Sequence, residues 1–210
     1  PWLEIDNPTD GFLRRMKIFG VNHFILFQET HDNDLFHKLH VGNRVKVDFE
    51  KRLEVVDRAI DAGFKNVGIG ALFGLNPDID EEIKGLIAHA YKIEERGVSV
   101  CVFAPTVKNF GKIILIDEII KEIYLKLRLA LPQVCIGLSG RESIALRNQL
   151  FSIVDLIGVG GVTNPGGRTV YKDEYEIGNK QFGLLDERTV REIVACLDQQ
   201  RIQVTDKVWK

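Results

Sequence analysis

Gln28 and Glu29 are the residues of this sequence best placed to do chemistry, because they end its most hydrophobic strand-like run, HFILFQE at 23–29. In a barrel of parallel strands, the chemistry lies at the carboxyl ends of the strands. Neighbouring strand residues face opposite ways, so only one of the two is expected to point inward. A functional role for Glu29 is preferred over the alternative, a surface ion pair with an arginine or lysine.

Other polar or flexible residues also follow apolar runs, and they form the wider set of candidates. Arg52 falls in the first turns of a predicted helix, close to its apolar face. From there it could reach the barrel mouth and hold a carboxylate with two parallel hydrogen bonds, although a solvated salt bridge is an equal alternative. The remaining strand-end candidates are Asp6, Asn7, Thr30, His31, Gly74, Pro105, Thr106, Ser139, Arg141, Glu142, Thr163 and Asn164.

Two further patterns permit other chemistry. His31, His37 and His40, with Asp32 and Asp34, could suggest a metal site, but their spacing matches no helical zinc pair, and a ligand-gating loop is the preferred interpretation. The turn GVGGVTNPGG at 158–167 resembles a phosphate-binding turn, since barrels often bind phosphate in the loops after their last two strands. Glycine-rich turns are common, so this pattern is weak alone.

The stretch DFEKRLEVVDRAIDAGFKNVGIGALFGL at 48–75 organises the rest of the chain. Asp48 can cap a helix with one apolar face, and Gly63 can end it. In the strand that follows, bulky residues alternate with small ones, so one side carries bulk and the other mostly hydrogen. A barrel strand needs this asymmetry if helices cover its outside and a ligand fits inside. The bulky positions are Val67, Ile69, Ala71 and Phe73, and the others are Gly68, Gly70, Leu72 and Gly74.

The same alternation of strand and helix runs along the chain and predicts an α/β fold, a TIM-type (β/α) barrel formed by a single domain over 1–210. It is incomplete, with about six units where a complete barrel has about eight, and the first two are expected to be lacking. The predicted strands are 2–6, 23–29, 67–73, 98–105, 133–140 and 156–161, the predicted helices are 9–19, 48–62, 78–96, 115–130, 142–154 and 187–200, and 30–44 is expected to be a polar loop.

The composition is that of an ordinary globular protein. The chain has 210 residues, 45% hydrophobic and 28% charged, with a formal net charge of -2, so nucleic acid is a poor candidate partner. Its three cysteines, Cys101, Cys135 and Cys196, are far apart in sequence and read as buried thiols in a reducing compartment. Apolar runs fall short of a membrane span, and a cytoplasmic location is expected.

Several segments together resemble, in the same order, the radical S-adenosylmethionine enzymes related to biotin synthase. The resemblance is strongest to the aromatic amino-acid lyases, which include 2-iminoacetate synthase of thiamine thiazole synthesis and the tyrosine lyase of iron-iron hydrogenase maturation. It covers most of the chain from about Phe27 to Ile193. The segments are FQETH, RLEVVDRAIDAGFKNVGIGALFGL, LRLALPQVCIGLSGRES, TNPGG and QFGLLDERTVREIV.

The resemblance implies a [4Fe–4S] cluster that reduces S-adenosylmethionine, giving a 5′-deoxyadenosyl radical that abstracts hydrogen from a small-molecule substrate in the barrel. It implies that Glu29 and Arg52 hold the amino-acid end of S-adenosylmethionine, with Gln28, Gly70 and Leu72 beside them. The strand ends on the far side would bind the substrate, through Ser139, Arg141, Val162, Thr163 and Asn164.

The sequence departs from this family in two ways. The family's three-cysteine cluster motif follows the first strand, and the cysteines of this chain cannot replace it at their spacing, so the cluster ligands are expected outside this chain. The lyases also carry an arginine just before the threonine of their TNPGG-like loop, where this chain has Val162. Free tyrosine or tryptophan is therefore not the expected substrate.

Two alternatives to a radical enzyme stay open at this point. One is a non-catalytic barrel that binds a ligand or a partner protein. The other is an aldolase- or isomerase-type barrel whose glycine turn binds a phosphorylated substrate. Because a barrel lacking units exposes an edge strand near Leu3 and Ile5, a partner chain or self-association is expected to cover that edge.

Overall fold

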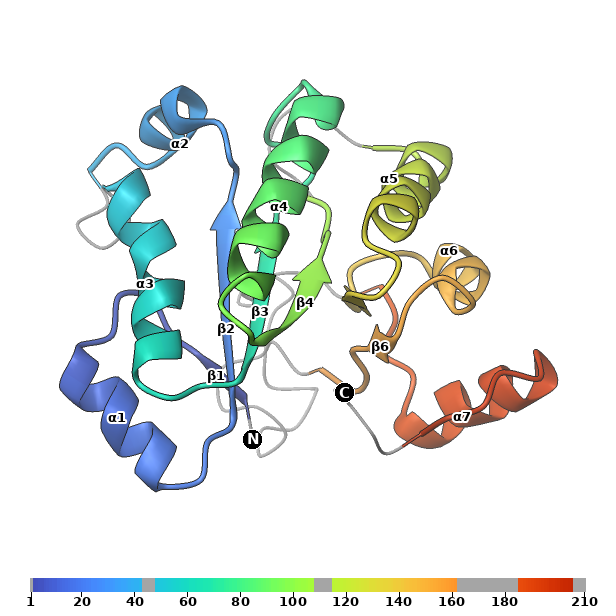
Figure 1. The fold of residues 1–210 in the computed structure, drawn as a ribbon. Helices are drawn as coiled ribbons and strands as arrows, with labels where there is room; N and C mark the ends of the chain where they lie inside the picture. Colours follow the sequence, from blue (N-terminus) through green and yellow to red (C-terminus); the bar gives the residue numbers. More distant parts are fainter. Residues whose placement is uncertain (1, 43–47, 108–114, 162–184, 206–210) are drawn as a thin grey trace, which may run out of the picture.

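In the part of the chain that the structure describes, six parallel strands form one sheet whose spatial order follows the chain, β1-β2-β3-β4-β5-β6 (Figure 1). The computed structural model describes residues 2–42, 48–107, 115–161 and 185–205. The strands alternate with helices to form an incomplete (β/α) barrel, which confirms the predicted fold class. The strands are β1 (Trp2–Glu4), β2 (His23–Glu29), β3 (Asn66–Ala71), β4 (Ser99–Phe103), β5 (Cys135–Leu138) and β6 (Leu156–Ile157).

The helices lie on one face of this sheet, with α3, α4 and α5 side by side across it in Figure 1. Except in α5, their first turns are stabilised by side chains that precede them: Thr9, Asp32, Asp48, Asp78, Ser143 and Thr189 each accept a hydrogen bond from a backbone N–H of the helix that follows. The helices are α1 (Asp10–Ile18), α2 (Asn33–Leu39), α3 (Phe49–Asp61), α4 (Ile79–Glu94), α5 (Asp117–Ala130), α6 (Ile144–Leu150) and α7 (Val190–Gln199).

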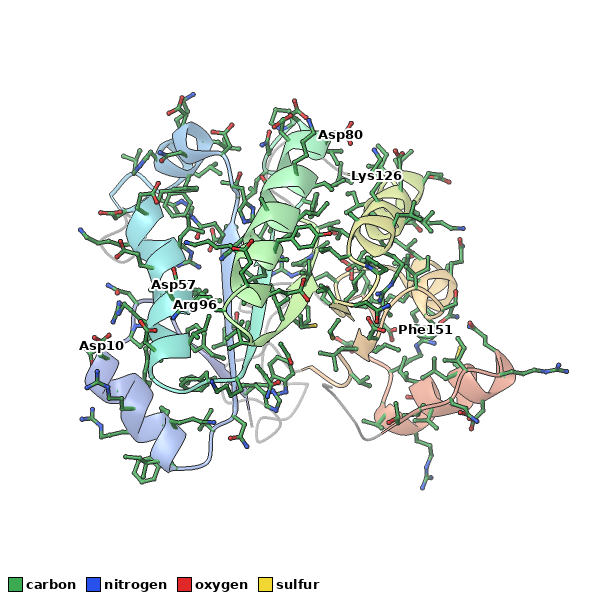
Figure 2. The ribbon with its side chains drawn as sticks, in the orientation of Figure 1. Asp10, Asp57, Asp80, Arg96, Lys126 and Phe151 are labelled. Carbon is green, nitrogen blue, oxygen red and sulfur yellow. The ribbon has the colours of Figure 1, made fainter. Side chains whose placement is uncertain are left out.

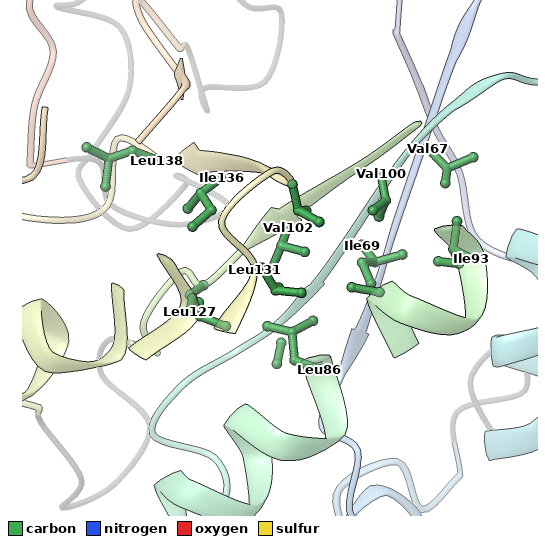
Figure 3. Packing of buried hydrophobic residues seen from close by; sticks show 14 of the residues in the cluster. Val67, Ile69, Leu86, Ile93, Val100, Val102, Leu127, Leu131, Ile136 and Leu138 are labelled. Carbon is green, nitrogen blue, oxygen red and sulfur yellow. The ribbon is translucent and has the colours of Figure 1, made fainter. Parts of the chain in front are cut away.

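Alternate strand residues and the apolar faces of the helices build the core (Figure 3). Val67 and Ile69 of β3 are fully buried, as are Leu86 of α4 and Leu127 of α5. Burying each such side chain stabilises the fold by roughly 1.5–3 kcal/mol. The bulky side of β3 therefore faces the helices, as the sequence predicts.

The opposite face of the sheet is the barrel interior, where β3 has Gly68 and Gly70 in place of bulky side chains. A Cβ built on Gly68 would lie 2.4 Å from a side-chain carbon of Ile25, and one on Gly70 would lie 2.9 Å from the ring of Phe27. One on Gly137 would lie 2.1 Å from the ring of Phe103. The rings of Phe27 and Phe103 are 5.6 Å apart, so the glycines make room for aromatic rings of the protein itself.

Ion pairs join neighbouring helices on the outer surface (Figure 2). Arg96, just past α4, donates to Asp57 of α3 at 2.8 Å, and Lys126 of α5 donates to Asp80 of α4 at 2.7 Å. Exposed pairs of this kind are worth about 1 kcal/mol at most. These ion pairs therefore contribute less than the packing of the core to holding the helices in place.

A buried ion pair fixes the segment that leads into α7. The carboxylate of Asp186 accepts hydrogen bonds from Arg147 of α6 and, at 2.9 and 2.6 Å, from Arg188. Burial alone would raise the pKa of Asp186, but the hydrogen bonds from Arg188 and the charge of Arg147 outweigh it and lower that pKa to about 2. Arg147 also donates to the carbonyl of Gly158 at 2.6 Å, which ties α6 to the end of β6.

Several elements are shorter than expected, such as β1, β5, β6 and α7, and two differences have a clear local cause. Part of the expected polar loop is the helix α2, which begins after the capping carboxylate of Asp32 and buries Phe36 completely. The helix expected over 142–154 is shorter, because Ser143 caps it and leaves Glu142 outside, where its carboxylate accepts from Ser139. Within the described ranges, none of the helices is long and apolar enough to cross a membrane.

Candidate functional site

Glu29 ends β2 in a conformation that few residues other than glycine adopt. Its φ is 76°, and the pairing of β2 with β3 shifts by one residue between Phe27 and Glu29. This bulge turns the Glu29 side chain, which is 14% exposed, toward the mouth of the barrel. Backbone strain of this kind costs roughly 1–3 kcal/mol and persists only where the surroundings enforce it.

Arg52 of α3 holds the bulge in place through hydrogen bonds to its main chain. Its Nε and Nη2 donate to the carbonyl of Phe27 at 2.9 and 2.7 Å, and its Nη1 donates to the carboxylate of Asp6 at 2.7 Å. Nη2 also lies 3.5 Å from a Glu29 oxygen. The Arg52 side chain is only 7% exposed, and these contacts show that it reaches the strand ends, as its helical position predicts.

His40 approaches Glu29 from the other side. Its Nε2 lies 2.8 Å from the carboxylate of Glu29, and its Nδ1 lies 2.8 Å from the carbonyl of Phe36. Both ring nitrogens of His40 lie within hydrogen-bond distance of oxygen atoms. Asp6, Arg52, Glu29 and His40 therefore form a continuous row of polar contacts across the ends of β1 and β2.

A buried carboxylate on α4 anchors the residues that follow Glu29. Glu82 accepts from the hydroxyl of Thr30 at 2.6 Å and from the backbone N–H of His31 at 2.8 Å. It also accepts from the His31 ring, Nδ1 to Oε1, at 2.8 Å. Burial, and then the charge of His31, lowers the pKa of His89 to about 3, so His89, 3.3 Å from the other His31 nitrogen, is neutral near pH 7.

Gln28 and Glu29 face opposite sides of the sheet, as strand geometry requires. The Gln28 side chain is buried on the helix side, and its amide nitrogen lies 3.4 Å from the carbonyl of Phe49. Gln28 is thus separated from the barrel mouth, where it was expected to accompany Glu29. The histidines considered as a metal site are also separated. The ring of His31 contacts Glu82, whereas the ring of His40 contacts Glu29.

Gly70 and Leu72 are the other expected contacts of S-adenosylmethionine. They flank Ala71, the residue of β3 that pairs with Glu29 of β2. The backbone N–H of Leu72 donates to the carbonyl of Glu29 at 2.7 Å, which helps to hold the bulge. Gly70 lies under the ring of Phe27, and a Cβ there would also lie 2.7 Å from the Phe103 carbonyl oxygen. A side chain at residue 70 would displace both aromatic residues next to the site.

Arg141 is the cation at the end of β5. Its guanidinium lies 3.4 Å from the carbonyl of Thr106, and its backbone N–H donates to Ser139. Burial lowers the pKa of Arg141 below its usual value, while the charges of Glu142, Glu4 and Glu29 oppose that change. The barrel mouth thus has an anion at one end, Glu29, and a cation at the other. Val162, Thr163, Asn164 and the glycine turn after them lie outside the described residues.

The described residues fit the two expected cofactors differently. A carboxylate held at the barrel mouth by a neighbouring guanidinium matches the ammonium of an amino acid, so the site fits the amino-acid end of S-adenosylmethionine. In the described part of the chain, histidine, cysteine and acidic side chains nowhere gather in a group of three that could hold a metal ion. The described residues thus bring together no set of side chains that fits an iron–sulfur cluster.

The sequence did not reveal the two residues of α4 that fix the segment after Glu29. No sequence pattern singles out a role for Glu82, yet its side chain is 1% exposed. Gly85 lies where a Cβ would come within 2.4 Å of the His31 Cβ, so α4 can approach the strand end only with glycine there. A glycine in the middle of a strongly periodic helix was the available signal.

The curated relatives of this chain include 2-iminoacetate synthases. The chain is 27% identical to the enzyme of Escherichia coli (strain K12) and 26% identical to that of Salmonella typhimurium. Each match covers 99% of this chain and 56% of the enzyme. No family model matches the sequence.

Solved structures of hydrogenase maturases share the fold. The FeFe-hydrogenase maturase HydG from Carboxydothermus hydrogenoformans superimposes with a TM-score of 0.81 and 33% identity, over 96% of this chain and 47% of the maturase. A second HydG structure also gives a TM-score of 0.81, with 30% identity. These likenesses support the resemblance of the chain to radical S-adenosylmethionine enzymes. The chain spans about half the length of these relatives, from 44% to 56%, and the resemblance read from its sequence is confirmed.

Proposed function

We propose that this chain forms the part of a radical S-adenosylmethionine barrel that binds the amino-acid end of the cofactor and one side of a small substrate. The observation that carries the proposal is the Glu29 carboxylate, which is held at the barrel mouth by a strained bulge and remains 14% exposed. A left-handed backbone at a residue other than glycine is a costly arrangement. Such costs are concentrated at functional sites.

Glu29 is the residue proposed to contact the ligand. Its carboxylate would accept hydrogen bonds from the ammonium of S-adenosylmethionine, replacing some of the water that the ammonium loses on entering the barrel. His40 and Arg52 lie on either side, 2.8 and 3.5 Å away, and together fix the direction of this carboxylate. Arg52 acts as a positioning residue, since its hydrogen bonds go to Phe27 and Asp6.

The end of β5 is proposed to hold the substrate. Arg141 supplies a positive charge there, and Ser139 orients it by accepting the Arg141 backbone N–H at 3.2 Å. The aromatic rings of Phe27 and Phe103 line the interior below these residues and exclude water from the reacting region. Val162 stays part of this proposal, as the residue whose apolar side chain makes a free amino-acid carboxylate a poor substrate.

In this superfamily, S-adenosylmethionine and a reduced cluster supply a 5′-deoxyadenosyl radical that takes hydrogen from the substrate. The residues described here bind, orient and shield the reactants of that chemistry. A lyase or rearrangement reaction in cofactor biosynthesis or metallocofactor maturation, within the cytoplasm, is the class of activity proposed. The names of the relatives support that class.

The test is anaerobic reconstitution of the natural full-length polypeptide with iron and sulfide. We expect the electron paramagnetic resonance signal of a reduced [4Fe–4S] cluster, and formation of 5′-deoxyadenosine from S-adenosylmethionine. A protein that binds no iron and releases no 5′-deoxyadenosine would instead favour a non-catalytic barrel.

A further inference from the structure

Two cysteines that are 34 positions apart in sequence meet inside the sheet. Cys101 of β4 and Cys135 of β5 are partners in the register of these parallel strands. Their sulfur atoms are 2.8 Å apart, with the Cys135 thiol donating toward the Cys101 sulfur. This is closer than the roughly 3.5–4 Å at which unbonded heavy atoms ordinarily settle.

The pair lies on the interior side of the barrel. Side chains along a strand alternate between its two faces, so Cys101 shares a face with Phe103, and Cys135 shares one with Gly137. The Phe103 ring covers Gly137 on that face. Cys101 is completely buried, whereas Cys135 is partly exposed, so the pair has one accessible sulfur and one sheltered sulfur.

The backbone already has the geometry that a disulfide needs. Register partners in neighbouring strands have α-carbons about 4.8 Å apart, which lies within the range of about 4.4–6.8 Å seen in disulfides. Bond formation requires a sulfur to move only about 0.8 Å, from 2.8 Å to the bond length of about 2.05 Å. Rotation of one side chain achieves this without moving a strand.

We propose that Cys101 and Cys135 are an oxidisable thiol pair that closes a disulfide between β4 and β5 when the protein meets a small-molecule disulfide. The inference is independent of the S-adenosylmethionine site, which lies at the other end of the strands. Its chemical partner is any low-molecular-weight disulfide small enough to reach Cys135. Oxidation of the pair would then join β4 and β5 covalently.

The reaction proceeds by two exchanges. Cys135 loses its proton, and its thiolate attacks the small disulfide, forming a mixed disulfide and releasing one small thiolate. Cys101 then loses its proton, attacks the Cys135 sulfur and expels the second small thiolate. Two protein thiols are oxidised by two electrons, and one small disulfide is reduced to two thiols.

The surroundings assign the order of these steps. Burial raises the pKa of Cys101 well above its usual value, and the neighbouring Cys135 adds to that effect. A thiol that ionises reluctantly is a poor first nucleophile, because the thiolate is the reactive form. The partly exposed Cys135 therefore meets the oxidant, and Cys101 resolves the mixed disulfide.

The test is peptide mapping of the natural full-length protein after anaerobic exposure to oxidised glutathione, acid quenching and alkylation of free thiols. Trypsin places the two cysteines in separate peptides, 97–108 and 129–141, each with a single cysteine. We expect these peptides to appear joined, two hydrogens lighter than their sum, and to separate on reduction. Two fully alkylated peptides, or a Cys135–glutathione adduct that goes no further, would overturn the proposal.

Three variants sharpen the result. Cys101→Ser should stop at the glutathione adduct of Cys135, whereas Cys135→Ser should leave Cys101 unmodified. Cys196→Ser, which removes the thiol on α7, should leave the joined peptides unchanged. Oxidation should also raise the midpoint of thermal unfolding of the wild-type protein by several degrees and leave that of Cys135→Ser unchanged. A joined peptide that contains Cys196 would contradict the assignment.

Discussion

The guanidinium of Arg52 donates two hydrogen bonds to the main-chain carbonyl of Phe27, at 2.9 and 2.7 Å. That carbonyl belongs to the residue at which the register of β2 shifts, so α3 fixes the bulge through this one contact. The bulge in turn gives Glu29 its left-handed backbone and its direction. Arg52 therefore sets the position of the Glu29 carboxylate, the candidate ligand-binding group, by holding the main chain of β2.

Glu82 and its neighbour Glu81 on α4 form a matched pair for testing the anchor beneath the site. Glu82→Ala removes the acceptor of Thr30 and His31 and leaves buried donors without partners, which should lower the free energy of unfolding by about 3 kcal/mol. Glu81 is exposed and pairs with Lys84, so Glu81→Ala should change it by less than about 0.5 kcal/mol. Urea unfolding measures both, and equal effects would refute the role given to Glu82.

Gly85 and Gly11 are both helical glycines and should respond oppositely to alanine. At Gly85 a Cβ would lie 2.4 Å from the His31 Cβ, and such overpacking costs roughly 1–3 kcal/mol. At Gly11 the nearest atom outside the helix backbone is the end of Arg15 at 4.0 Å, so Gly11→Ala should stabilise by about 0.5–1 kcal/mol. Unfolding midpoints decide the matter, and a stabilising Gly85→Ala would show that α4 has room to move.

Acid should weaken the fold through Asp186. Its pKa is lowered to about 2 in the folded protein from the ordinary value of 3.8, so its contribution is complete above about pH 4 and is lost as the pH falls through 2. Asp186→Asn should remove this part of the pH dependence of unfolding and destabilise the protein at pH 7, because Arg147 then stays buried without a charge partner. Unfolding free energies measured between pH 2 and 7 test this, and parallel profiles for the two proteins would contradict it.

The sequence predicted the helices and strands that carry the site better than the contacts within it. Helices α3 and α4 have one apolar stripe and a capping aspartate each, Asp48 and Asp78, and both follow the pattern closely. The alternation of glycine with bulk in β3 correctly assigned one face to the helices. Local patterns of this kind reflect contacts that each element makes along its whole length.

The details that the sequence did not reveal depend on single long-range contacts. The left-handed backbone of Glu29 is imposed by Arg52 and Leu72, which are 23 and 43 positions away in sequence. The meeting of Cys101 with Cys135 follows from the strand register, which alternation does not specify between two particular strands. Helix α2 was hidden by polar residues, since its seven residues bury only Phe36 completely.

Tyrosine is expected to be a poor substrate, because Val162 replaces the arginine that meets its carboxylate in the related lyases. The reconstituted full-length enzyme should therefore form little p-cresol from tyrosine, and Val162→Arg should create tyrosine binding. Chromatographic measurement of p-cresol and 5′-deoxyadenosine tests both statements. Tyrosine-dependent release of p-cresol by the wild-type enzyme would disprove this account of the substrate.

The proposed role of Glu29 is tested most directly by isothermal titration calorimetry of S-adenosylmethionine with the full-length reconstituted protein. Glu29→Gln should weaken binding roughly 10- to 100-fold, the usual effect of losing one charge-assisted contact in a shielded site, and Arg52→Ala should do the same by releasing the bulge. Glu50→Gln, an exposed acid in the first turn of α3, is the matched control and should bind like the wild type. Unchanged affinity in both Glu29→Gln and Arg52→Ala would remove these residues from the site.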